Sequence, residues 1–282
     1  MSAVATIIES VKNAAHALRE HSDSPRLDAE LLLAKVMGLP RSALIVRGEE
    51  ALDWSHEEAY EKLIRARAGG TPVAYLTGIR EFWSLPLKVS PAVLDPRPET
   101  ECLVEQALAL MPRDEACSVL DLGTGSGAIA LSLARERPHW RITGADVSDA
   151  ALRVAAGNAE SLGLRQIRWR LSDWFAALPG ERFHLIVANP PYIAALDPAL
   201  NRLTAEPALA LVSGPTGLEA LSAIIAAAPK HLCPRGRLAL EHGMAQAPDV
   251  ARLLQRHGFD SIRTHHDFSG RPRVTLGILT QH

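Results

Sequence analysis

The length, composition and charge of this chain describe an ordinary globular protein and exclude several classes. Its 282 residues are enough for two domains, 47% are hydrophobic, and the formal net charge is −2, so no strong overall field draws nucleic acid or an anionic membrane. The three cysteines are scattered, which excludes a disulfide framework and a zinc cluster, and no apolar run is long enough to span a bilayer. We therefore expect a cytoplasmic, monomeric protein that binds neither nucleic acid nor membranes.

The first 70 residues are predicted to form a helical domain. Apolar residues recur every three or four positions over Val4–Leu18, which predicts a first helix. A second helix is expected to begin at Ser24-Pro25, with the proline in its first turn, and to end at Gly38. Ser55 and Glu58 have the spacing of a capping box, which predicts the start of a third helix.

Residues 71–98 are expected to be a linker, because prolines punctuate this segment at short intervals. Within it, Phe82–Val89 predicts a short hairpin. A helix is then expected to begin near Thr100, at the start of a second domain that comprises residues 99–282.

From residue 117 onward, predicted strands and helices alternate. The strands are expected at Val119–Leu122, Arg141–Ala145, Ile167–Leu171, Phe183–Ala188, Arg237–Glu241, Ile262–His266 and Val274–Leu279. Such alternation is typical of an α/β fold, an open and mostly parallel sheet with helices on both faces. The last two strands are joined by a connection too short for a parallel return, so we expect them to form an antiparallel hairpin.

A glycine-rich turn follows the first of these strands. It consists of Gly123, Thr124, Gly125, Ser126 and Gly127. Its G-x-G-x-G spacing differs from the G-x-G-x-x-G that binds a dinucleotide pyrophosphate. The turn therefore favours a ligand that has an amine and a carboxylate but no phosphate, such as S-adenosylmethionine.

Two further positions at strand ends suit the same ligand. Asp146 follows the second strand, where a carboxylate can accept hydrogen bonds from both ribose hydroxyls, although such a residue can also serve as a helix N-cap. After the third strand, Asp173 is placed to accept from an adenine amino group, and Trp174 to pack on the ring. A parallel sheet brings these strand ends to one edge, beside the glycine turn.

A stiff elbow, Asn189, Pro190, Pro191 and Tyr192, follows the apolar strand Phe183–Ala188. The prolines end the strand because neither has an N–H for the sheet. Carbonyl oxygens and an aromatic ring at one place suit a planar NH2 group. The elbow predicts methyl transfer to an amide or to an exocyclic amino nitrogen.

The residues leave several functions open. A nucleic-acid base presents the same NH2 group, but no basic stripe is present to read it. A nucleotide-dependent oxidoreductase would need the pyrophosphate fingerprint that is missing here. A binding module with an inactive donor site is disfavoured because every expected motif is intact.

These motifs, in this order, resemble the class I S-adenosylmethionine-dependent methyltransferases. Val93–Glu101, which contains Arg-Pro-Glu-Thr-Glu, narrows the resemblance to the release-factor glutamine methyltransferases, the PrmC/HemK family. The likeness extends to Asp28–Leu33 near the N-terminus and to Arg273–Gly277 near the C-terminus. It implies a Rossmann-like seven-stranded sheet with a C-terminal antiparallel hairpin, and a small N-terminal helical domain for substrate recognition.

The resemblance also implies a substrate and a set of contacts. Members methylate the side-chain amide of the glutamine in the Gly-Gly-Gln motif of class-1 peptide-chain release factors and leave S-adenosyl-L-homocysteine as product. By similarity, the donor is held by Gly123–Gly127, Asp146, Trp174 and Asn189, and the glutamine by Asn189–Tyr192. Glutamine methylation of a ribosomal protein is the nearest alternative, because its motifs are almost the same.

The mechanism expected from these residues is one of orientation. We hypothesise that the Asn189 side-chain oxygen and the Pro190 carbonyl each accept one N–H of the substrate amide, while Tyr192 covers its face. The methyl group of a sulfonium is already activated, so no metal is expected to take part.

Overall fold

The computed structural model describes residues 5–113 and 115–280, which form two compact units. The smaller unit runs to Ile79 and includes Arg202–Ala205; the larger comprises Arg80–Asn201 and the chain from Glu206 onward. The chain thus passes from one unit to the other inside the segment 71–98 that was expected to be a linker. Among the described residues, no helix is both long enough and apolar enough to cross a membrane.

The smaller unit is helical, as the sequence predicted. Its helices are α1 (Ile7–Ala17), α2 (Pro25–Met37), α3 (Arg41–Val46), α4 (Trp54–Ala68) and α5 (Val73–Thr77). Their apolar faces enclose one core, in which Leu32 and Leu33 are fully buried and the Tyr60 hydroxyl donates to the Ala29 carbonyl at 3.0 Å. The short helices α3 and α5 have too few residues for a periodic pattern and were not predicted.

The helix ends of this unit test the predicted caps. Helix α2 begins at Pro25 and ends at Gly38 with φ +64°, which confirms both predictions. The capping box predicted at Ser55 is wrong. Asp53 caps α4 instead, because its carboxylate accepts from the Ser55 backbone N–H at 2.8 Å and the helix already begins at Trp54.

The expected hairpin forms, but it starts earlier than predicted. Its strands are β1 (Ile79–Phe82) and β2 (Leu85–Lys88). Trp83 and Ser84 connect them with φ of 51° and 58°. Positive φ at both positions is the geometry of a two-residue turn, whose twist matches that of the flanking strands.

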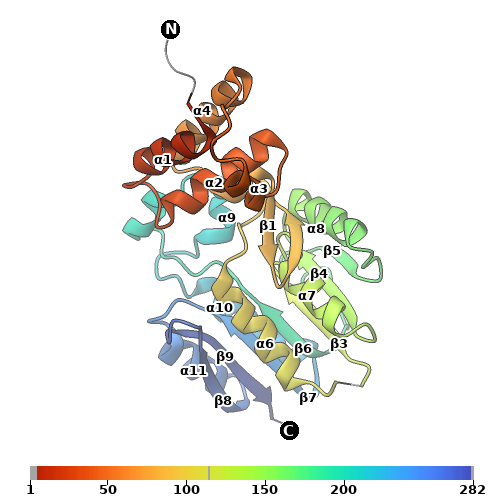
Figure 1. Ribbon diagram of the computed structural model, residues 1–282. Coiled ribbons are helices and arrows are strands. Elements are labelled where there is room, and N and C mark those ends of the chain that lie inside the picture. Colours follow the sequence, from red (N-terminus) through yellow and green to blue (C-terminus); the bar gives the residue numbers. More distant parts are fainter. Residues whose placement is uncertain (1–4, 114, 281–282) are drawn as a thin grey trace. The chain divides into compact units, whose positions relative to one another are not determined.

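The larger unit is built on a seven-stranded sheet with the order β5-β4-β3-β6-β7-β9-β8. Its strands are β3 (Ser118–Leu122), β4 (Arg141–Asp146), β5 (Arg168–Leu171), β6 (Phe183–Ala188), β7 (Leu232–Glu241), β8 (Phe259–His266) and β9 (Pro272–Leu279). Strands β3 to β7 run parallel, and β9 pairs antiparallel with both β7 and β8. In Figure 1 the hairpin β8–β9 closes one edge of the sheet, as predicted.

Helices cover both faces of this sheet: α6 (Glu101–Leu110), α7 (Ala128–Glu136) and α8 (Asp149–Ser161) share one core with it, and α10 (Glu219–His231) and α11 (Ala247–Arg256) share the other. Three short helices lie in the connections, η1 (Pro98–Thr100), η2 (Pro198–Arg202) and α9 (Ala208–Leu211). On β6, Leu185 and Val187 pack in the core with α6 and α7, whereas Ile186 and Ala188 pack in the core with α10 and α11. This two-residue alternation is why the strand reads as a continuous apolar run.

Most strand positions agree closely with the sequence, and Phe183–Ala188 agrees at both ends. The exceptions are β7 and β8, which begin earlier than predicted. In β7, Leu232 pairs with Phe183 across an irregular stretch whose register shifts before Leu185. Irregular pairing of this kind leaves no periodic signal in the sequence.

Candidate functional site

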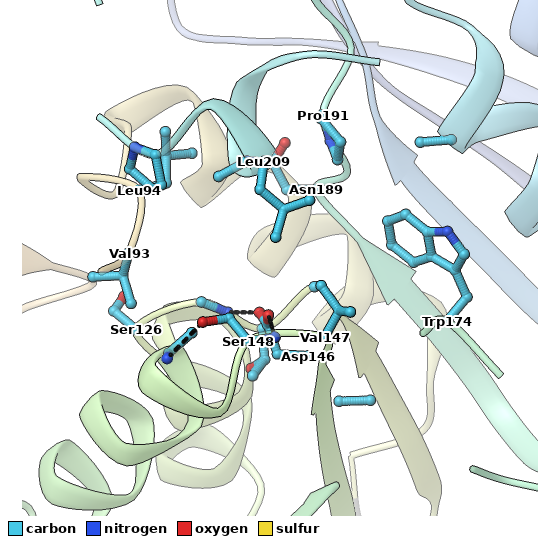
Figure 2. Close-up of a pocket in the computed structure, with 18 of the residues that line it drawn as sticks. Val93, Leu94, Ser126, Asp146, Val147, Ser148, Trp174, Asn189, Pro191 and Leu209 are labelled. Carbon is cyan, nitrogen blue, oxygen red and sulfur yellow. Dashed lines mark hydrogen bonds between the residues drawn. The ribbon is translucent and has the colours of Figure 1, made fainter. Parts of the chain in front are cut away.

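A cavity of about 550 Å³ opens in the larger unit at the carboxyl ends of the parallel strands. Figure 2 shows Asp146 and Ser148 on one side of it, Asn189 and Pro191 on the other, and Trp174 at the flank. Further walls come from Val93 and Leu94 and from Leu209 of α9. Segments that are distant in the sequence thus meet where an α/β sheet ordinarily binds its ligand.

The glycine turn lies open to the cavity at two of its three glycines. Gly123 and Gly125 have φ of +69° and +55°, and a Cβ on Gly123 would meet nothing closer than the Trp174 ring at 3.7 Å. Gly127 is different, because a Cβ there would press on Leu131 at 3.0 Å. The first two glycines therefore give a ligand access to the backbone, and the third allows close packing beneath the turn.

A buried carboxylate holds this turn against α7. Asp121 accepts from the Thr124 hydroxyl at 2.6 Å and from the Ala130 backbone N–H at 3.2 Å. Burial raises the pKa of Asp121 to about 7, and these two hydrogen bonds oppose the rise. The acidic residue before the turn is thus an anchor for it, and Asp121 itself is not among the residues that line the cavity.

Asp146 is fixed by backbone donors on both oxygens. Its Oδ2 accepts from the Gly125 N–H and its Oδ1 from the Ser148 N–H, each at 2.9 Å. Ser148, not Asp146, caps α8, since its hydroxyl accepts from the Ala151 N–H at 3.2 Å. Burial raises the pKa of Asp146, and the backbone hydrogen bonds oppose it. A carboxylate accepts about four hydrogen bonds, so capacity remains for the hydroxyls of a ligand.

The segment after β5 brings Asp173 and Trp174 to the cavity wall, as expected. Trp174 has φ of +45°, uncommon for a bulky residue, and the Ser172 hydroxyl donates to its carbonyl at 2.8 Å. The same hydroxyl oxygen accepts from the Ala177 N–H at 3.0 Å. Local hydrogen bonds therefore fix the backbone that aims the indole.

Only part of the elbow after β6 lines the cavity. Asn189 and Pro191 line the cavity, whereas Pro190 and Tyr192 are not among the residues that line it. The Asn189 Nδ2 donates to the Thr100 hydroxyl oxygen at 3.1 Å. The side-chain oxygen of Asn189 takes no part in that hydrogen bond. Tyr192 packs against the core shared with α10 and α11.

Several residues at the site were not predicted. Val147 lines the cavity with half of its surface exposed, and its signal was an apolar residue directly after the strand-end carboxylate. Gln246 donates from Nε2 to the carbonyls of Tyr192 at 3.1 Å and Gly217 at 3.2 Å, and accepts from the Gly243 N–H at 2.8 Å. We call these three hydrogen bonds the Gln246 clamp. The sequence carries no signal for it, because all three partners are backbone groups and two of them are distant in the sequence.

A cluster of charges connects the Arg-Pro-Glu-Thr-Glu segment to Glu206 and Pro207. Arg97 pairs with Glu206 and lies 3.8 Å from Asp95, which in turn lies 3.5 Å from Arg80. Pro207 lines the cavity, so this cluster supports one of its walls. These contacts all lie inside the larger unit. Within the described residues, no group of three His, Cys, Asp or Glu side chains could hold a metal ion.

Two protein families match parts of the chain. Residues 9–78 match the PrmC N-terminal domain, and residues 98–215 match the methyltransferase small domain. The first match falls on the helices of the smaller unit. The second contains the glycine turn, Asp146 and the elbow that begins at Asn189.

Individual relatives match over nearly the whole length. The release factor glutamine methyltransferase of Salmonella typhimurium is 49% identical over 261 residues, or 92% of this chain and 94% of that protein. The enzyme of the same name from Coxiella burnetii is 44% identical over 271 residues, or 96% and 98%. Among solved structures, the T. thermophilus 16S rRNA N2 G1207 methyltransferase in complex with AdoMet and guanosine covers 71% of this chain and 49% of its own, with a TM-score of 0.55 at 22% identity. That last likeness shows a shared fold.

Proposed function

The chain belongs to the release factor glutamine methyltransferase family, and we propose that it transfers a methyl group from S-adenosyl-L-methionine to a glutamine of class-1 peptide-chain release factors. The acceptor is the side-chain amide nitrogen in the Gly-Gly-Gln motif, and S-adenosyl-L-homocysteine is the second product. One observation carries the proposal: an open glycine turn, a fixed carboxylate and an oriented carboxamide line the same cavity.

The cavity suits the donor in size and in chemistry. Its volume of about 550 Å³ is within the usual range for small-molecule sites. The turn at Gly123 and Gly125 admits the methionine end close to the backbone, and Asp146 has acceptor capacity for the ribose hydroxyls. Val147 and Trp174 offer apolar surface for the adenine, and Asp173 an acceptor for its amino group.

The acceptor side suits an amide nitrogen. When bound, S-adenosylmethionine supplies a methyl group that is already activated on sulfur. A carboxamide nitrogen is a poor nucleophile because its lone pair is delocalised into the carbonyl, so orientation and electrostatic support matter most. The Asn189 side-chain oxygen accepts one substrate N–H. We assign the second to the Pro190 carbonyl, although Pro190 is not among the residues that line the cavity in this structure. Both oxygens favour the positive charge that grows on nitrogen as its bond to the methyl carbon forms.

The relatives' names favour a release factor over the two alternatives that the sequence left open, a ribosomal protein and a nucleic-acid base. The cytoplasmic location, the monomeric state and the absence of nucleic-acid or membrane binding remain part of this proposal. The role of Tyr192 in covering the substrate amide also remains a proposal, although in this structure its ring packs against the core and is not among the residues that line the cavity.

A labelling experiment tests the proposal. The protein is incubated with S-adenosylmethionine labelled in its methyl group and with a purified class-1 release factor, or with the same factor in which the Gly-Gly-Gln glutamine is replaced by asparagine. We expect label in the first factor alone, and mass spectrometry should place one methyl group on that glutamine. Equal labelling of both factors, or labelling of purified ribosomal proteins in its place, would reject the assignment.

A further inference from the structure

The elbow Asn189–Tyr192 leaves the sheet at its first residue and must be held by other groups at its last. Ala188, the residue before it, ends β6 and pairs with both neighbouring strands, so the start of the elbow is fixed with the sheet. The two prolines that follow have no N–H to donate. The position of the oxygens that we assign to the acceptor therefore depends on what holds the elbow at Tyr192.

The chain directly after the elbow pairs with another connection. The Ile193 N–H donates to the Leu211 carbonyl at 3.0 Å, and the Ile193 carbonyl accepts from the Ser213 N–H at 2.9 Å. Ser213 lines the cavity. This partner segment leads from α9 to α10 and is not a strand of the seven-stranded sheet. The pairing thus joins two connections to each other, and something else must fix them against the sheet.

The Gln246 clamp ties both connections to the sheet. Its Nε2 donates to the carbonyls of Tyr192 at 3.1 Å and Gly217 at 3.2 Å, and its Oε1 accepts from the Gly243 N–H at 2.8 Å. Gly243 follows closely on the end of β7, and Gln246 directly precedes α11, which packs in the core beside β6 and β7. Both hydrogens of the carboxamide and its oxygen are used, so its orientation is fixed.

Gly217 brings its backbone directly against the elbow. Its φ is +79°, a left-handed conformation that favours glycine. A Cβ at this position would lie 2.4 Å from the Tyr192 carbonyl oxygen and 3.2 Å from the Ala194 nitrogen. No residue with a Cβ could keep this separation without displacing the elbow. The glycine and the Gln246 clamp therefore act together on the same carbonyl.

We propose that Gln246 is a positioning residue for methyl transfer, which holds the elbow so that the Asn189 side-chain oxygen and the Pro190 carbonyl both reach the acceptor nitrogen. Its role in catalysis rests on the proposed function. Gln246 does not line the cavity, so it acts through the Tyr192 carbonyl and not by contact with substrate. Two oxygens that guide one nitrogen must be placed together, and a misplacement of about 1 Å can cost about 100-fold in rate.

A second carboxamide with the same bonding pattern lies on the donor side and offers a matched comparison. The Asn158 Nδ2 donates to the carbonyls of Ser126 at 2.9 Å and Lys88 at 3.0 Å, and its Oδ1 accepts from the Lys88 N–H at 2.8 Å. Ser126 belongs to the glycine turn, and Asn158 is fully buried. Loss of either carboxamide removes three similar hydrogen bonds from the fold, but on opposite sides of the cavity.

Two variants use this match to separate positioning from structural support. Gln246→Met and Asn158→Leu remove each carboxamide and keep the size of its side chain. In Gln246→Met we expect kcat for release-factor methylation to fall about tenfold or more, with the KM for S-adenosylmethionine unchanged. In Asn158→Leu we expect the opposite split, a raised KM for S-adenosylmethionine and a near-normal kcat. The same change of both constants in the two variants would show a merely structural role and overturn the proposal.

A second pair leaves Gln246 in place. Gly217→Ala sets a methyl group against the Tyr192 carbonyl and should also lower kcat about tenfold. The control is Gly163→Ala, because Gly163 has a similar φ of +72° but a Cβ there would meet nothing within 4 Å. It carries comparable backbone strain without a contact to the elbow, and we expect a normal kcat. Equal kcat values in these two variants would overturn the proposal.

A measurement without acceptor substrate keeps the inference separate from the proposed function. Tyr192-Ile193 is the one Tyr-Ile pair in the sequence, so tyrosine labelled with carbon-13 at its carbonyl and isoleucine labelled with nitrogen-15 mark a single peptide unit for nuclear magnetic resonance. Exchange of the Ile193 amide hydrogen with solvent should be about tenfold faster in Gln246→Met, because the elbow opens more readily, and near normal in Asn158→Leu.

The exchange rate decides the inference whatever the acceptor is. Unchanged exchange at Ile193 in Gln246→Met would overturn the inference even if release factors are methylated. Faster exchange in that variant alone would support it even if another acceptor is found.

Discussion

The two halves of the cavity are held in different ways. The half that we propose binds the donor is fixed by hydrogen bonds to backbone groups, such as that from the Gly125 N–H to Asp146, 21 residues away. The acceptor half is fixed by side chains that meet across long stretches of sequence: Asn189 and Thr100 are 89 residues apart, and Arg97 and Glu206 are 109 apart. The geometry of the donor half therefore depends on strand ends and turns, whereas the geometry of the acceptor half depends on contacts between segments that are distant in the sequence.

This difference implies that the two halves can be damaged separately. Substitutions in the donor half should weaken donor binding, and substitutions in the acceptor half should lower turnover while donor affinity remains. A variant that changes donor affinity and turnover together would show that the two halves are coupled.

Asn189→Ala should have the largest effect. It removes the proposed acceptor for one substrate N–H, and the loss of one directed hydrogen bond in a transition state costs about 3 kcal/mol, so turnover should fall about 100-fold. Single-turnover methylation measures the rate, and calorimetry measures the affinity for S-adenosylmethionine, which should change much less. Near-normal turnover in a folded variant would remove Asn189 from the mechanism.

Asp146→Ala should affect the other half. Loss of two hydrogen bonds to a charged acceptor should weaken S-adenosylmethionine binding roughly 30-fold, or about 2 kcal/mol. At saturating donor, kcat should stay within a few-fold of normal. Asp146→Asn is the matched control, since it retains one acceptor for the backbone N–H groups. If kcat falls as steeply as affinity, the two halves are coupled and the comparison fails.

Arg97→Ala tests the support of the acceptor wall. The Glu206 side chain is only 2% exposed; it would lose its charged partner and keep the hydrogen bond from the Asp95 N–H at 3.3 Å. Breaking a fully buried pair costs 3–5 kcal/mol, but Arg97 is 32% exposed, so we expect a loss of about 1.5 kcal/mol in the free energy of unfolding. Urea denaturation measures it. Arg153→Ala, in an exposed pair with Asp149, is the control and should change stability by less than about 0.5 kcal/mol.

The smallest effect is expected in the pH dependence of stability. The pKa values of Asp121 and Glu241 are raised to about 7 in the folded protein, so between their ordinary values and 7 the folded state binds more protons than the unfolded state. These groups therefore make stability rise as the pH falls from about 7.5 toward 5. Glu241→Gln removes one of them, and its melting temperature should depend less steeply on pH across that window. Parallel curves for the variant and the unmodified protein would contradict the raised pKa.

The sequence predicted that the glycine turn and Asp146 lie together at one edge of the sheet, because the signals for both are local. A glycine turn after an apolar strand, and a carboxylate at the next strand end, need only the knowledge that parallel strands end at one edge. It also predicted that Asn189 lies at this edge. It did not predict the clamp made by Gln246, the anchor made by Thr100 or the place of Tyr192 behind the wall, because each depends on which distant side chain the packing brings near.

The alternation of strands and helices, the antiparallel end of the sheet and the meeting of the glycine turn with Asp146 at one edge all follow from the sequence, since hydrophobic period and turn chemistry act over a few residues. How the Asn189 carboxamide is held follows only from the packing of the folded unit. The Asn189 Nδ2 donates to the hydroxyl oxygen of Thr100, 89 residues away, and these two segments meet only in the folded unit.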